Sequence, residues 1–184
     1  MVVLALRPGD RVASTQLAVV TVAVLVGAAW GAAAPQLWNG LGLVVTVGLL
    51  AWAGGGRPVR WRRPDPVLSG LAVMGLVAAV VYGNPLARNT IEVEDITNGV
   101  SHYPMQASLA IAVAGLVGLA AVTRSRLPAG TAAFTAVWLG VESVVYPGLP
   151  GSLGGIGGAL TVGWGVAVSV VLAVARRRAD PHGG

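Results

Sequence analysis

Residues 54–66 read Gly54-Gly55-Gly56-Arg57-Pro58-Val59-Arg60-Trp61-Arg62-Arg63-Pro64-Asp65-Pro66. This stretch carries a third of the 12 basic residues of the chain and lies between two long apolar runs. Loops rich in Arg are retained on the cytoplasmic side of a membrane. We therefore expect this loop to be cytoplasmic, and the direction of every other apolar segment follows from that placement.

The composition is typical of a membrane protein. Of 184 residues, 55% are hydrophobic and 10% are charged, whereas a soluble domain carries about 25% charged residues. The net charge is +5, but the Arg residues flank apolar runs and do not form a basic face. We therefore expect no nucleic-acid partner. Membrane lipids are the expected partners, because anionic headgroups attract basic loops.

Six apolar segments have lengths near those of membrane-crossing helices, for which about 17–25 residues are needed. The sequence thus predicts an all-α integral membrane protein, a bundle of six transmembrane helices. The expected spans are about 16–34, 37–53, 67–83, 105–122, 131–146 and 156–175. Residues 1–15 and 176–184 are expected to be cytoplasmic tails.

The distribution of Arg agrees with this division. When the loop 54–66 is placed inside, six spans put both termini in the cytoplasm and leave only Arg88 outside. The first span resembles a cleavable signal sequence, but Pro35 would follow the cleavage site, so we expect a retained anchor. The expected location is the cytoplasmic (plasma) membrane, with both ends of this multi-pass chain inside. Prolines are expected outside the spans or at their ends.

Several kinds of chemistry are excluded by residue counts. The chain has no Cys and two His, so it has no thiolate nucleophile, no disulfide and no Cys-ligated metal. The acidic residues of the loop 84–104 match no calcium-binding pattern, and we interpret this loop as solvated. No common catalytic motif is present. We expect no catalytic residue, no metal site, no cofactor and no enzyme activity.

Glu142 is the one acidic or basic residue inside a predicted span, and such residues are candidates for function because a charge in lipid is costly. It belongs to a polar and aromatic stripe with spacings of four, three, four and four. Residues at these spacings share one face of a helix, which we expect to face the bundle interior. The stripe comprises Thr131, Thr135, Trp138, Glu142 and Tyr146.

Other polar residues are expected at the same outer level. With members of the stripe they form a candidate ligand-binding set: Glu142, Trp138, Thr135, Tyr146, Asn39, Gln106 and His102. These side chains predict an outward-facing polar pocket. The alternative interpretation is that they are the ordinary polar ends of membrane helices. Arg88 is a candidate counter-charge for Glu142 or for the acidic loop.

Small residues recur every four positions and predict close helix packing, because dispersion between closely approaching backbones drives helix association in lipid. The sixth span carries Gly157, Thr161, Gly165 and Ser169 in this register, and the first span carries Gly27 and Gly31. We expect these faces to pack within the bundle or against another subunit.

Three functions are compatible with these features. The first is small-solute or ion transport, or a role as the membrane subunit of a transporter, with the pocket near Glu142. The second is a non-catalytic assembly or scaffold subunit of a membrane complex, whose partners are other membrane subunits or a second copy of the chain. The third, which ranks behind both, is a lipid-acting membrane enzyme with Glu142 and His102 as acid and base.

Overall fold

The computed structural model describes residues 11–31, 34–53, 59–88 and 103–179. This part of the chain forms six helices and no strand, which confirms the all-α prediction. The helices are α2 (Arg11–Trp30), α3 (Ala34–Ala53), α4 (Pro66–Arg88), α5 (Tyr103–Thr123), α6 (Arg126–Val145) and α7 (Gly154–Ala179).

Five of these helices, all except α3, are long and apolar enough to cross a membrane. In α3 the apolar segment is shorter and covers Leu37–Leu50. Large apolar side chains are exposed along α4 and α7, for example Val81 and Ile156. Exposed apolar faces of this extent are expected where lipid surrounds a protein. The helices are therefore those of a membrane protein.

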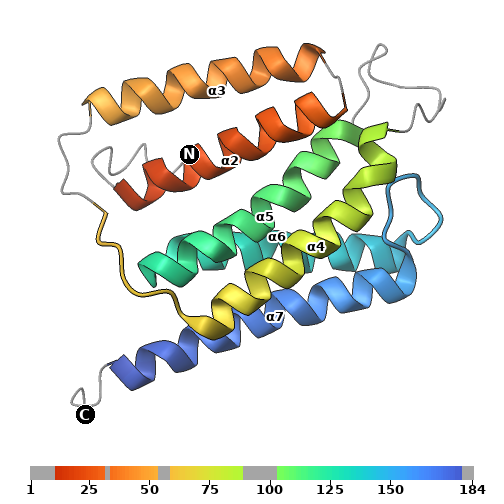
Figure 1. Cartoon of the computed structure of the whole chain (residues 1–184). Coiled ribbons are helices and arrows are strands. Elements are labelled where there is room, and N and C mark those ends of the chain that lie inside the picture. The colour runs from red at the N-terminus through yellow and green to blue at the C-terminus, as the bar shows by residue number, and fades with distance from the viewer. Residues whose placement is uncertain (1–10, 32–33, 54–58, 89–102, 180–184) are drawn as a thin grey trace.

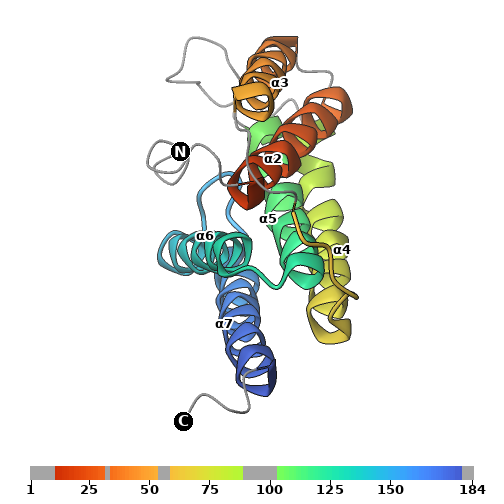
Figure 2. The same cartoon turned by 90° about the vertical axis from the view of Figure 1, so that its left-hand side faces the viewer.

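Helix α5 is central to the arrangement. It packs along α4 and α2 and also contacts α6, and α6 in turn packs along α7. Helix α4 meets α7 over a much smaller contact, and α4, α5, α6 and α7 form one group of neighbouring helices (Figure 2). Helices α2 and α3 lie on the other side of α5, with α3 packed on α2 (Figure 1).

The segment before α4 joins that helix to the end of α5. The amides of Arg62 and Asp65 donate to the carbonyls of Val122 and Ala121, at 2.8 and 3.1 Å. Asp65 also caps α4, since its Oδ1 accepts from the amides of Val67 and Leu68. Backbone groups at both helix ends, which lack partners within their own helices, are thereby satisfied.

Helix ends differ from the predicted spans. Helix α2 begins at Arg11 and ends at Trp30, and α6 begins at Arg126, where Ser125 is the N-cap. Helix α4 continues to Arg88, past the predicted span 67–83, and includes Pro85 in its last turn. The reason is that an apolar run marks the part of a helix that lies in lipid, whereas capping and polar turns decide where the helix stops.

Helices α6 and α7 cross at glycines. A Cβ at Gly140 would lie 2.6 Å from the carbonyl oxygen of Gly158, and a Cβ at Gly158 would lie equally close to that of Gly140. The packing face of α7 comprises Gly158, Gly165, Val168 and Leu172. The predicted face is thus correct at Gly165 but wrong at Ser169, which is exposed. Gly27 packs within the bundle, against Ser108 of α5.

Candidate functional site: a cavity among four helices

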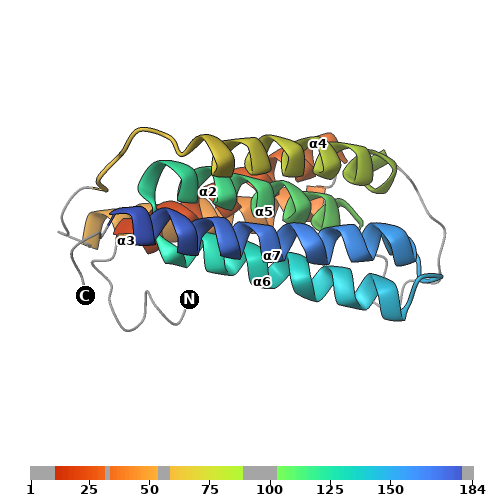
Figure 3. The same ribbon diagram turned by 90° about the horizontal axis from the view of Figure 1, so that it is seen from below.

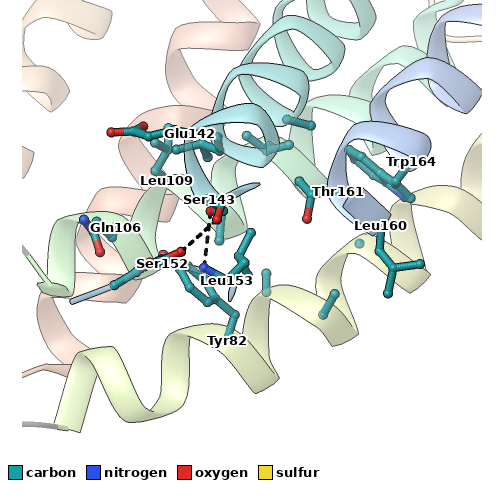
Figure 4. A pocket seen from close by; sticks show the side chains of 18 of the residues that line it. Tyr82, Gln106, Leu109, Glu142, Ser143, Ser152, Leu153, Leu160, Thr161 and Trp164 are labelled. Atoms are coloured by element: carbon teal, nitrogen blue, oxygen red, sulfur yellow. Dashed lines mark hydrogen bonds between the residues drawn. The ribbon is translucent and has the colours of Figure 1, made fainter. Parts of the chain in front are cut away.

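A cavity of about 430 Å³ lies among α4, α5, α6, α7 and the turn 146–153 (Figure 4). Small-molecule sites in proteins typically have volumes of about 300–1,000 Å³. Its lining includes apolar side chains from all four helices, such as Met74, Leu109, Leu139 and Leu160. The polar lining residues are Tyr82, Gln106, Glu142, Ser143, Tyr146, Ser152, Thr161 and Trp164.

The turn 146–153 covers one end of this cavity and is fixed to α4 and α6. The Tyr82 hydroxyl donates to the carbonyl of Gly151 at 2.6 Å. Ser143 holds the same turn from α6, because its Oγ accepts from the amide of Leu153 at 3.2 Å. Gly151 has φ +82°, a conformation that strongly favours glycine. These bonds give the cavity a defined wall at the end where α7 begins.

Trp164 lies at the opposite part of the cavity. Its indole Nε1 donates to the carbonyl of Leu71 at 3.1 Å, which links α7 to α4 where the two helices have little other contact. Gly75 makes room for the ring, since a Cβ there would lie 2.7 Å from Cζ2 of Trp164. The indole therefore separates the cavity from the half of the molecule that contains the Arg-rich segment.

Gln106 reaches the cavity from the first turn of α5. Its Oε1 is buried and has no hydrogen-bond partner among the described residues. This oxygen lies against Gly151, where any larger residue would collide with it. A buried amide oxygen without a donor costs free energy, on the order of 1–3 kcal/mol.

Glu142 lies on α6 at the edge of the cavity, and its side chain is exposed. Figure 4 shows the carboxylate on the side of Gln106 and Leu109, turned away from Thr161 and Trp164. Within the described part of the chain, no residue donates a hydrogen bond to this carboxylate or forms an ion pair with it. Glu142 is thus an acceptor at the edge of the cavity that has no donor among the described residues.

Three of the seven predicted ligand-binding residues, Gln106, Glu142 and Tyr146, line the cavity together. Thr135 and Trp138 lie on α6 outside its lining, and Asn39 is an exposed residue of α3, away from it. His102 lies outside the described residues, as does the side chain of Arg88. The predicted pocket therefore forms in part, around fewer side chains.

The expectation that the whole stripe of α6 faces the bundle interior is wrong. Trp138 is 63% exposed and Tyr146 is 57% exposed, and Glu142 is exposed as well. The buried face of α6 consists of small residues, among them Ala132, Ala136 and Gly140. Close approach to α7 requires small side chains, so size and not polarity decides which face is inside.

Sequence reasoning placed Tyr82 at the outer polar level but did not assign Ser143, Thr161 and Trp164 to the cavity. Ser and Thr within helices can bond to their own backbone and then give no sign of a site. Thr161 does so, donating to the carbonyl of Gly157 at 2.8 Å. A signal for Ser143 was available, because it precedes a Gly/Pro-rich turn whose amides need acceptors.

The described residues contain no group of three or more His, Asp or Glu that could hold a metal ion. Compared with protein-family models, with curated proteins and with solved structures, the chain matches none.

Proposed function

We propose that the protein is a small-solute transport protein, or the membrane subunit of a transporter, that binds its solute in the cavity beside Glu142. The observation that carries this proposal is a cavity of ligand size that brings Gln106, Glu142 and Tyr146 to one place. A carboxylate within a membrane helix is retained at a cost, and binding a substrate is a common reason for that cost.

The proposed topology has six spans in the plasma membrane with both ends in the cytoplasm. The segment with Arg60, Arg62 and Arg63 and the turn 146–153 lie at opposite ends of the helices (Figure 3). If the Arg-rich segment is cytoplasmic, the cavity is in the outer half of the membrane. A solute then reaches the site from the outside or from the outer leaflet.

One observation favours a second function, a non-catalytic assembly subunit. Helix α3 packs on α2 and leaves a row of apolar side chains exposed, including Trp38 at 75%. Another membrane subunit, or a second copy of this chain, would cover such a face in a complex. We rank this function second because lipid covers an apolar face equally well.

The proposed function is tested by extracting the protein with its native lipids and measuring the mass of the intact assembly. We expect a small molecule to remain bound to the wild type and to be lost in Glu142→Gln, with the fold kept. Thr135→Val is the matched control, because Thr135 lies on the same helix outside the cavity. Retention of the molecule by Glu142→Gln to the same extent as by Thr135→Val would contradict the proposal. So would the absence of any bound molecule from the wild type and from both variants.

A further inference from the structure

We infer that the ligand of this cavity is a small amphipathic amine, with its ammonium group at Glu142 and its hydrocarbon body leaving between α4 and α7. This inference rests on the proposed function of the cavity and names the chemical class of the ligand. Three observations carry it: the apolar walls, the Glu142 carboxylate and the lateral opening.

The walls of the cavity suit an apolar body. Between its two ends the lining is aliphatic, with Ala78, Ala110, Val113, Leu139 and Leu160 among its members. Most polar groups in the lining already have partners within the chain. Tyr82 donates to Gly151, Trp164 donates to Leu71, and Thr161 donates to Gly157. A polar body would find few groups to bond with and would lose its hydration.

The charged group at this end of the cavity is an acceptor. The Glu142 carboxylate lines the cavity and has no donor within the described residues. A complementary head group must therefore donate hydrogen bonds. A carboxylate beside an apolar wall also favours a positive charge over a neutral group and repels a negative one. An ammonium group satisfies both requirements.

The cavity also opens between α4 and α7, toward the side of the molecule that lipid covers. Met74 of α4 is 53% exposed and Leu160 of α7 is 70% exposed, and both line the cavity. A second hollow of about 720 Å³ shares Met74, Ala78 and Tyr82 with it and continues along α4 past Val77, Val81 and Pro85. The two hollows share lining residues, so apolar surface continues from the cavity to the exposed face of α4.

The charge at one end and the apolar opening at the other together determine the orientation of the ligand. The head group lies at Glu142, where α5 and α6 end near the membrane surface, and the chain follows the path along α4. A hydrocarbon chain that enters from the bilayer has already left water, so it exchanges lipid contacts for contacts with Met74 and Leu160. Selectivity is thus expected to come from the head group.

Photolabelling tests this inference directly. Octylamine, octanol and octanoate, each with a diazirine in its chain, are added to the full-length protein in lipid nanodiscs, and labelled residues are identified by mass spectrometry. We expect octylamine to label Met74, Leu160 and Trp164 about tenfold more efficiently than octanol, and octanoate to label them least. Glu142→Gln is expected to remove the preference for the amine and to leave labelling by octanol unchanged. Thr135→Val is expected to change neither.

The outcomes separate the inference from the proposed function. Cavity labelling that is equal for the three head groups, or strongest for octanoate, would overturn the amine assignment and leave a ligand-binding cavity. No cavity labelling by any of the three would overturn the inference as a whole. In that case a native small molecule lost in Glu142→Gln would still support the proposed function.

Two variants of α4 test whether the ligand enters between α4 and α7. Ala78 is an exposed lining residue of both hollows, whereas Val80 is exposed on the same helix and lines neither. We expect Ala78→Trp to lower octylamine labelling of Trp164 at least fivefold by filling the path, and Val80→Trp to leave it unchanged. Equal labelling of the two variants, with both eluting as the wild type does, would overturn entry between α4 and α7.

Discussion

At the scale of single residues, Glu142 is the one acidic side chain within the six described helices. The sequence could identify it because a carboxylate in an apolar segment is conspicuous. Its surroundings could not be predicted, because α6 has apolar residues on every side and a weak periodicity. The buried side of α6 is selected by the small size of Ala132, Ala136 and Gly140. The helical periodicity of polar and apolar residues does not reveal a buried face that is determined by side-chain size.

Gly140 gives a prediction at this scale. Gly140→Leu would place a side chain against the carbonyl of Gly158 and the amide nitrogen of Val162, 2.9 Å from the site of the new Cβ. Helices α6 and α7 would have to separate, and we expect a loss of about 1–3 kcal/mol in the free energy of unfolding, measured in mixed micelles. Gly163→Leu is the control on α7, because nothing lies within 4 Å of its Cβ position. Equal losses in the two variants would show that the crossing is not close.

At the scale of helices, each of the six described helices overlaps one of the predicted apolar segments, because Arg, Gly and Pro separate the apolar runs of the sequence. The sequence could not predict their ends. Helix α6 begins five residues before its predicted span, at Arg126, because Ser125 caps it and Pro128 is tolerated in a first turn. The contacts between helices could not be predicted from the sequence either. The segment before α4 is joined to α5 by hydrogen bonds from the backbone amides of Arg62 and Asp65, and such bonds do not depend on side-chain type.

Helix α3 gives a prediction at this scale. The six-span topology requires α3 to cross the membrane, which places Asn39 and Arg60 on opposite sides. Because the chain has no natural Cys, Asn39→Cys and Arg60→Cys each carry a single thiol. We expect a membrane-impermeant maleimide to label Asn39→Cys in intact cells and Arg60→Cys only after permeabilisation. Labelling of both from the same side would mean that α3 does not cross.

At the scale of the whole molecule, α4, α5, α6 and α7 enclose a cavity that none of them specifies alone. The sequence led us to expect polar groups at one level of the membrane, and Gln106, Glu142 and Tyr146 do line one cavity. It gave no reason to expect the limited contact between α4 and α7 that leaves room for a ligand. That space depends on Trp164 and Gly75, which lie far apart in the chain and meet only in the fold.

If this cavity holds an amphipathic ligand between Glu142 and the lipid, the ligand should be visible in place. It can be sought by electron cryomicroscopy of the protein in lipid nanodiscs with octylamine and a rigid antibody fragment, which adds mass to a chain of 18.5 kDa. We expect elongated density from the Glu142 carboxylate to Met74, with α4 and α7 apart. Helices α4 and α7 packed side by side, with no cavity between them, would contradict this expectation.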